Sequence, residues 1–498
     1  MSRRKNIVQD YSYGGNVHVC SVDPMVDAML SDMRRIGDRE LLFTPLARCV
    51  NIMDRRSVFE DWLKVLGKGF LRFREEDSER RDKSKGVYRY DGRLWSPVNS
   101  VLLKDALKAY LTRDLAMNSN EWFRGESRFL EALYDGARLS PLNESRTMVA
   151  FVNGVFDFSE ISHPVYYPFG GGEPVVSSLP YSYDVKADCP LWKSFLCQVL
   201  DSEQRLLLQK YMSLGLVDRY DAPFKIEKCL WMVGPGGAGK STIQNVISHV
   251  YGEGRVSSLS LGQLLSGGND ERSRYVALMD GKIFNFCKEV QMEDITYRVD
   301  SFKSLCSGEP QQMRKIGGDV HEMREVPYLV FNMNRKPRSR NIDNALMRRI
   351  LFLSFRSPKR EEDFDLELES KLKKEAAGIR NWLIEGFVKL RSDGFRFDNP
   401  QSEVTESDEW FVQNGLTGEL FLRKMDCRYY SYSGEKEQGR WFPLKVIYGF
   451  YLEWCRKWGY DEDLDITGFG RLLRGMGFLS KRQSQGMSYR VYGGDKLV

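Results

Sequence analysis

A glycine-rich run that ends in lysine and serine is the strongest chemical signal in this sequence. Residues 234–241 read GPGGAGKS and fulfil the pattern GxxxxGK followed by serine or threonine. Glycines let the backbone curl so that its N–H groups point at phosphate oxygens, while Lys240 would reach the β- and γ-phosphates and Ser241 would bind Mg²⁺. The pattern therefore predicts a site for ATP with Mg²⁺. The residues expected to bind the nucleotide are Gly234, Pro235, Gly236, Gly237, Ala238, Gly239, Lys240, Ser241 and Thr242.

Polar residues after two other apolar runs would complete such a site. Glu289 follows the strand-like run 283–287, and a carboxylate there would activate the attacking water or bind Mg²⁺. Asn334 follows the run 328–331, and its amide would orient that water against the γ-phosphate. Both residues also have plainer interpretations, because a glutamate can simply end a strand at the surface and an asparagine can simply form a turn.

Two adjacent arginines precede a further apolar run, residues 350–355. Arg348 or Arg349 would there reach a nucleotide bound to a neighbouring subunit and stabilise the charge of the transition state. The alternative is an arginine at a solvated helix end, which is the better interpretation for this pair taken alone.

Two basic segments are candidates for contacts with nucleic acid. Residues 311–324 read as a hairpin around a Gly-Gly tip, and a hairpin with cationic arms suits the phosphates of a DNA strand. Residues 465–475 read as a helix and residues 478–493 as a hairpin, an order that is typical of a winged helix and serves DNA or protein contacts. Charges on an edge hairpin can also merely prevent aggregation. The predicted DNA-binding residues are Arg314, Lys315, His321, Arg471, Arg474, Lys481 and Arg482.

Strand-like and helical segments alternate around the glycine-rich run. The apolar run 229–233 precedes it, a helical stretch covers 240–251, and the strand-like runs 283–287, 328–331 and 350–355 follow. This alternation predicts a mostly parallel sheet with helices on both faces, whose strands end at one common edge. The expected fold class is therefore α/β.

Composition is that of an ordinary globular protein. The chain has 498 residues, of which 42% are apolar and 29% charged, enough for about three domains. The net charge is only +5, so any surface for nucleic acid must be local. Nine cysteines without a CxxC pair, together with only four histidines, favour reduced thiols in the cytoplasm and argue against a zinc site. Neither a membrane span nor a secretory signal is expected.

Taken in order, these segments resemble the superfamily 3 helicase domain of phage and plasmid primase–helicases, the group that includes the poxvirus primase–helicase. The likeness rests on GPGGAGKST, KIFNFCKEV, FKSLCSGEPQQMRKIGGDVHEM, VFNMNRKP and ALMRRILFLSF. Upstream, NGVFDF and LPYSYDVKADCPLWKSFL resemble the helical domain that precedes the ATPase in this family. Downstream, LKVIYGFYLEWCRKWGY and ITGFGRLLRGMGF resemble its C-terminal winged-helix segment. The likeness is most specific in the middle of the chain.

The resemblance implies a P-loop ATPase of the AAA+-like type that assembles as a homohexamer. It would move from 3′ to 5′ on single-stranded DNA and act on forked DNA in the replication of a phage, plasmid or other mobile element. A separate primase or replication initiator is an implied partner. By position, Lys240 and Ser241 match the Walker A pair, Glu289 the Walker B acid and Asn334 the sensor asparagine.

Arg349 best matches the arginine that acts in trans, with Arg348 beside it, and Lys315 and His321 fall in the DNA-contacting hairpin. The sequence departs from the family in two places. Lys288 stands where many members carry a first acid, which bears on how Mg²⁺ is positioned, and the hairpin tip is Gly-Gly rather than bulky and basic. No primase catalytic half is expected, because the segment before the resemblance is too short to hold one with its metal site.

The expected organisation has four parts: an N-terminal region (1–87), a mixed α/β domain (88–200), the helicase ATPase domain (201–357) and a C-terminal helical and winged-helix domain (358–498). Two rival functions stay open. One is an ATP-dependent switch or loader that binds DNA or a partner without unwinding. The other is a replication initiator with a degenerate ATPase, which only Lys288 favours. Strand displacement on a forked duplex separates a helicase from a loader.

Overall fold

The computed structural model divides into two compact units, residues 1–150 with 166–178 and residues 151–165 with 179–498. No helix of the described residues is long and apolar enough to cross a bilayer. The described residues are 24–40, 63–64, 66, 70–74, 87–114, 117–136, 138–141, 147–170, 175–217, 219, 222, 224–265, 269–287, 295–314, 319–339, 342–356, 365–397, 401–428, 439–484 and 486–493.

The first unit packs helices around a buried core that includes Leu107 and Trp122. Its small mixed sheet has the order β3-β2-β1-β4, in which β1 pairs antiparallel with β2 and parallel with β4. The Asp91-Gly92 turn joins β2 to β3, with φ of +102° at Gly92. The elements are α1 (Pro24–Glu40), β1 (Phe70–Arg74), β2 (Val87–Tyr90), β3 (Trp95–Pro97), α3 (Ser100–Ala109), the π-helical turn η2 (Tyr110–Asp114), α4 (Ser119–Gly136) and β4 (Arg138–Pro141). Strands β5 (Met148–Phe151), β6 (Gly154–Asp157) and β7 (Val165–Tyr167) follow along the chain, and β6 belongs to the second unit.

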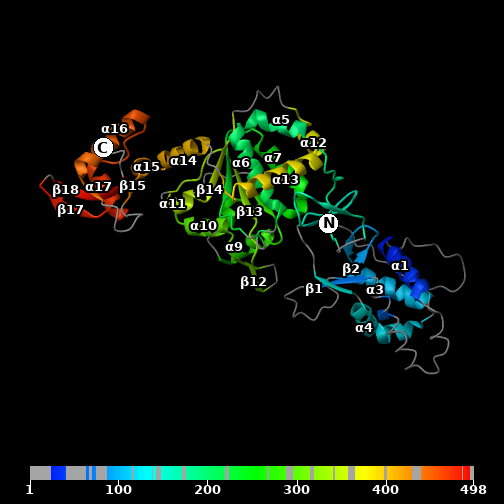
Figure 1. Ribbon diagram of the computed structural model, residues 1–498. Coiled ribbons are helices and arrows are strands. Elements are labelled where there is room, and N and C mark those ends of the chain that lie inside the picture. The colour runs from blue at the N-terminus through cyan, green and yellow to red at the C-terminus, as the bar shows by residue number, and fades with distance from the viewer. Residues whose placement is uncertain are drawn as a thin grey trace. The chain divides into compact units, whose positions relative to one another are not determined.

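Five parallel strands form the centre of the second unit, in the order β14-β8-β13-β10-β9 (Figure 1). The strands are β8 (Cys229–Val233), β9 (Val256–Ser257), β10 (Phe284–Cys287), β13 (Tyr328–Met333) and β14 (Ile350–Ser354). Every residue of β8, β10 and β13 is buried. Such continuous apolar strands are typical of a parallel sheet that is covered on both faces. The predicted α/β class with a parallel sheet is therefore confirmed.

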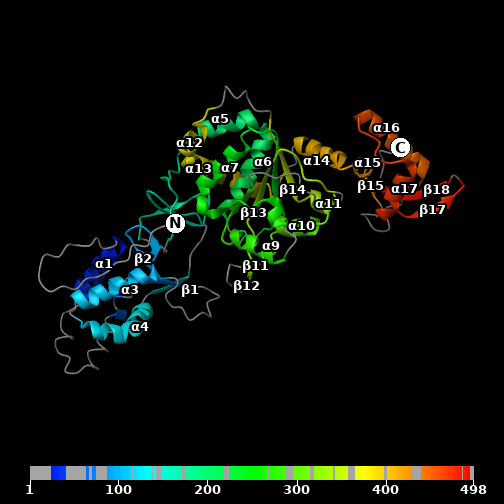
Figure 2. The same ribbon diagram turned by 180° about the vertical axis from the view of Figure 1, so that it is seen from behind.

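Helices cover both faces of this sheet (Figures 1 and 2). Leu230 and Met232 of β8 belong to a core shared with α5, α6, α7 and α13, whereas Trp231 and Val233 belong to a core shared with α9, α10 and α14. This alternation follows from the two-residue period of a strand. The helices are α5 (Pro190–Val199), α6 (Ser202–Ser213), η3 (Leu214–Leu216), α7 (Lys240–Tyr251), η4 (Glu253–Arg255), α8 (Leu261–Leu264), α9 (Asn269–Val276), η5 (Ala277–Met279), α10 (Val299–Ser307), α11 (Asn344–Met347), α12 (Leu368–Lys373), α13 (Ala376–Ser392) and α14 (Gln401–Gln413).

Two further features follow the pattern of the sequence. Strands β11 (Gln311–Arg314) and β12 (Val320–Met323) form an antiparallel hairpin between α10 and β13. Near the C-terminus, Asp465 caps α17 by accepting a hydrogen bond from Gly468 N, and β17 then pairs antiparallel with β18. The elements of this last part are α15 (Thr417–Lys424), β15 (Cys427–Arg428), β16 (Arg440–Pro443), α16 (Leu444–Trp458), α17 (Ile466–Gly475), β17 (Ser480–Gln483) and β18 (Gly486–Gly493).

Candidate functional site

The glycine-rich loop joins β8 to α7 and therefore lies at the carboxyl edge of the sheet. Its backbone has positive φ at Gly234 (+156°), Gly237 (+76°) and Gly239 (+89°). A side chain at Gly239 would also meet the neighbouring helix, because an added Cβ would lie 2.9 Å from Phe195 Cζ. The loop conformation therefore requires glycine at this position for two reasons, the backbone angle and the close approach of α5.

Lys240 is the first residue of α7 and is only 4% exposed. Its ammonium donates hydrogen bonds to the carbonyl oxygens of Gly234 (2.6 Å) and Pro235 (2.7 Å) and to Oδ1 of Asn334 (3.2 Å). These acceptors are neutral, and burial lowers the pKa of the Lys240 ammonium. A buried cation surrounded by neutral oxygens fits an anion, because phosphate oxygens would supply the compensating charge.

Strand β13 brings two asparagines to the loop. It pairs in parallel with β8 on one side and with β10 on the other. Asn334 lies one residue beyond its end and meets Lys240, while the buried Asn332 donates from Nδ2 to Ser241 Oγ at 3.1 Å. The contact between Asn332 and Ser241 does not follow from spacing in the sequence. Its only signal there is an amide within an otherwise apolar run, YLVFNM.

The acid expected from the sequence, Glu289, lies outside the described residues, as does Lys288. The strand before it, β10, ends at Cys287 beside β13, so the carboxyl end of β10 lies at the edge of the sheet that holds the glycine-rich loop. Gln244 of α7 is buried and donates from Nε2 to the carbonyl oxygen of Cys287 at 3.3 Å. This hydrogen bond connects α7, the helix that follows the glycine-rich loop, to the end of β10.

The two adjacent arginines have different surroundings. The Arg349 guanidinium is buried and donates to Ser307 Oγ at 2.9 Å and to the carbonyl oxygen of Ala345 at 2.8 Å. The Arg348 side chain is 65% exposed. Glu227 lies 3.6 Å from Arg348 and 3.4 Å from Arg349. Of the pair, Arg348 is the one whose side chain reaches solvent, whereas the Arg349 side chain is held by residues of the same chain.

A buried ion pair connects helix α14 to residues 334–339, the segment that follows β13. The Lys336 ammonium is 3% exposed and contacts the carboxylates of Glu406 and, at 3.4 Å, Glu409. Glu406 also accepts a hydrogen bond from Ser354 Oγ of β14 at 2.8 Å. The Glu406 side chain is 16% exposed and that of Glu409 54%, so Glu406 is the partner that compensates Lys336 inside the protein.

Trp410 makes a second connection from α14 to the same segment. Its indole N–H donates to the carbonyl oxygen of Pro337 at 2.7 Å. The ring packs edge-on against Trp231 of β8, with 5.0 Å between ring centroids. Because β8 leads into the glycine-rich loop, α14 contacts both the strand before that loop and the segment that follows β13.

The β11–β12 hairpin carries the first group of predicted DNA contacts. Met313 lies opposite His321, and His321 is exposed. The Arg314 side chain is half exposed and lies 3.6 Å from Asp270. Lys315 and the hairpin tip lie outside the described residues.

The second group of predicted DNA contacts lies at the C-terminal end of the chain. Arg471 and Arg474 of α17 are exposed, as are Lys481 and Arg482 of β17. The Lys481 ammonium lies 4.1 Å from the ring centroid of Trp441. The helix and the hairpin thus both present cations to solvent, which is the arrangement expected of a surface for phosphates.

Two protein families match parts of this chain. Residues 68–201 match the family described as D5 N terminal like, and residues 232–349 match DUF5906, a family of unknown function. The first match supports the resemblance to phage primase–helicases and begins at residue 68, upstream of the start at residue 88 predicted for the mixed α/β domain. It does not bear on superfamily 3. The second match spans the glycine-rich loop, the β11–β12 hairpin and the arginine pair.

Solved structures of the NrS-1 C terminal region are similar at low identity. The A form apo structure has 12% identity and a TM-score of 0.39, and the alignment covers 70% of this chain and 96% of that one. The apo structure of residues 305–718 has 14% identity and a TM-score of 0.34, and covers 70% of this chain and 95% of that one. No curated protein matches the chain.

Proposed function

We propose that this protein is an ATP-dependent DNA helicase of the phage primase–helicase type, built on an AAA+-like P-loop core. It would translocate on single-stranded DNA as a homohexamer during replication of a phage, plasmid or other mobile element. The observation that carries the proposal is the buried Lys240 ammonium, which meets only neutral oxygens among the described residues. A fixed cation at the start of a helix, beside a curled glycine loop, suits the β- and γ-phosphates of ATP.

The proposed chemistry is positioning and electrostatics. The loop N–H groups and Lys240 would neutralise the phosphate charge, and Asn334 would orient the attacking water. Glu289 would accept the proton of that water. Ser241 and Glu289 would hold Mg²⁺, which when bound supplies Lewis-acid stabilisation of the phosphate oxygens. Asn332, through Ser241 Oγ, would fix the orientation of that hydroxyl.

The order of the strands supports this assignment. Strand β13 lies between β8, which leads into the loop, and β10, which leads toward Glu289. Asn334, one residue beyond the end of β13, would therefore lie between Lys240 and the proposed acid Glu289. This is the location from which a side chain can contact the γ-phosphate and the water at once.

The trans-acting arginine is assigned to Arg348. Its exposed guanidinium can extend to a nucleotide bound by a neighbouring subunit, whereas Arg349 donates to Ser307 and Ala345 of its own chain. An arginine supplied in trans requires a ring or a dimer, and the family resemblance favours a hexamer. The hairpin β11–β12 and the α17–β17–β18 module, proposed to be a winged helix, would contact the DNA backbone.

ATP turnover with and without single-stranded DNA tests the proposal. We expect turnover in the wild type that DNA stimulates, and its loss in Lys240→Ala and Glu289→Gln. Asn334→Ala should reduce the turnover rate with little change in nucleotide affinity, because its amide acts on the reacting water. Wild-type protein that binds DNA but does not hydrolyse ATP would refute the motor and favour a replication initiator.

Strand displacement on a forked duplex then separates the helicase from an ATP-dependent loader. We expect the wild type to displace the strand only with hydrolysable ATP and only from forks with a 3′ tail on the loading strand. A protein with DNA-stimulated turnover but no displacement on any fork would be a loader or switch.

A further inference from the structure

One arginine that is not part of the candidate nucleotide site donates hydrogen bonds to four backbone carbonyls. The Nη1 of Arg219 donates to the carbonyl oxygens of Val326 (2.9 Å) and Pro327 (3.2 Å). Its Nη2 donates to those of Cys306 (2.8 Å) and Ile226 (3.1 Å). A guanidinium suits this task because its donors form a rigid planar fork, which the single ammonium of a lysine cannot reproduce.

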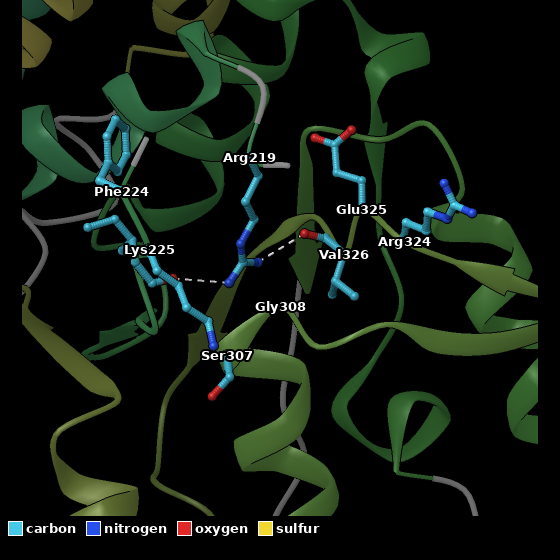
Figure 3. Close-up of a pocket in the computed structure, with 9 residues that line it drawn as sticks. Arg219, Phe224, Lys225, Ser307, Gly308, Arg324, Glu325 and Val326 are labelled. Carbon is cyan, nitrogen blue, oxygen red and sulfur yellow. Dashed lines mark hydrogen bonds between the residues drawn. The ribbon is translucent and has the colours of Figure 1, made fainter. Parts of the chain in front are cut away.

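The four carbonyls have a common relation to the β11–β12 hairpin. Cys306 lies in the last turn of α10, just before the hairpin, and Val326 and Pro327 lie between the hairpin and β13. Ile226 precedes β8, the strand that leads into the glycine-rich loop. Arg219 therefore joins both ends of the hairpin to the start of the loop strand. Figure 3 shows the guanidinium between these segments.

Further contacts fix the arginine in this place. Its guanidinium carbon lies 4.6 Å from the ring centroid of Tyr328, the first residue of β13. Gly308, which ends α10 with φ of +68°, leaves room for it, because a Cβ there would lie 2.6 Å from the Arg219 guanidinium carbon. Cys306 and Val326 are fully buried, so their carbonyls depend on a protein donor or an enclosed water.

A cavity of about 130 Å³ borders the arginine, and Lys225, Arg324 and Glu325 are among its lining residues (Figure 3). Its polar lining admits water. Water can therefore reach carbonyls that a shorter side chain at position 219 would release. A lysine at this position is expected to leave the unit folded while the connection to the hairpin is lost.

We propose that Arg219 is a positioning residue for the β11–β12 hairpin. It holds both ends of the hairpin in a fixed relation to β8, so that the hairpin and the glycine-rich loop move as one body. The inference rests on the proposed function in one respect, that the hairpin contacts DNA. Under that function, Arg219 is required for DNA to stimulate ATP turnover, although it touches neither DNA nor nucleotide.

The test compares the full-length wild type with Arg219→Lys in two measurements. One is the ratio of ATP turnover with and without single-stranded DNA. The other is amide hydrogen exchange of residues 311–314 and 320–323. We expect basal turnover within about twofold of wild type, loss of the DNA stimulation, and exchange of the hairpin amides at least about tenfold faster, because buried carbonyls lose their donors.

Two further variants keep the proposal falsifiable. Gly308→Ala pushes a methyl group against the Arg219 guanidinium and should reproduce both effects without altering Arg219. Arg380→Lys is the matched control, because Arg380 is also buried but stacks on Phe151 and Phe158, which lie outside the hairpin. It should change neither the stimulation nor the exchange of the hairpin amides.

If the hairpin amides exchange at the wild-type rate in Arg219→Lys, the proposal is overturned. It is also overturned if Arg380→Lys changes amide exchange and DNA stimulation as much as Arg219→Lys does, because that result would indicate a general destabilisation of the fold. The test of Arg219 can be distinguished from the test of the proposed function. If the wild type shows no DNA-stimulated turnover, the motor fails, while the exchange data still decide whether Arg219 holds the hairpin.

Discussion

The ion pair between Lys336 and Glu406 allows a quantitative prediction. Replacement of Glu406 by leucine leaves a buried ammonium with only the outer carboxylate of Glu409, 3.4 Å away and half exposed. Loss of one partner of a buried pair costs about 3–5 kcal/mol, whereas an exposed pair contributes under about 1 kcal/mol. Glu406→Leu should therefore loosen α14 far more than the same replacement at Glu409.

Amide exchange of α14 is the suitable assay, because a chain with more than one unit does not unfold in a single step. A loss of 3 kcal/mol in local opening corresponds to exchange faster by about 100-fold, since about 1.4 kcal/mol is a factor of ten. Glu409→Leu should change it by less than about fivefold. The double variant Lys336→Met with Glu406→Leu should recover most of the protection, because no charge is left unpaired.

Two results would refute this reasoning. Equal effects of the two single leucine variants would show that the buried carboxylate is not the main partner of Lys336. If the α14 amides exchange as fast in the double variant as in Glu406→Leu alone, then packing or the hydrogen bond to Ser354, rather than the uncompensated ammonium, determines the stability of α14.

Three other predictions concern single positions. Gly239→Ala should weaken binding of an ATP analogue at least about tenfold, because alanine is strained at the positive φ of this position. Gly254→Ala should leave binding unchanged, because an added Cβ there meets no atom within 4 Å, and binding calorimetry checks both variants. Arg348→Ala should abolish ATP turnover without lowering the melting temperature, whereas Arg349→Ala should lower the melting temperature. Recovery of turnover when Arg348→Ala is mixed with Lys240→Ala would confirm that Arg348 acts in trans, and a mixture without turnover would argue against this role. Burial raises the pKa of Glu419 in the folded protein to about 7, whereas the ordinary pKa of this group, which applies to the unfolded chain, is 4.5. Between these two pH values the folded protein keeps a proton that the unfolded chain has released, so the free energy of unfolding falls as pH rises from about 4.5 to about 7. Glu419→Gln should remove up to about 3 kcal/mol of that loss at pH 8 and have little effect at pH 4, as thermal melts at both pH values would show.

Local features of the fold could be predicted from the sequence alone. The glycine-rich loop between strand and helix, the alternation that yields a parallel sheet and the hairpins at 311–324 and 480–493 all appear in the structure. Each depends on residue types a few positions apart, such as glycine at a turn or apolar side chains at a fixed period, and these act through the backbone of the same segment.

Long-range contacts were decided by the tertiary structure. The pairing of β13 between β8 and β10 places Asn332 on Ser241, although 91 residues separate them. Burial alone distinguishes Arg349 from Arg348, which look equivalent as neighbours in the sequence. The role of Arg219 is invisible in the sequence, because a guanidinium that binds backbone carbonyls leaves no pattern in the identity of its partners. Strand order and carbonyl positions follow from the packing of whole elements, which no local spacing specifies.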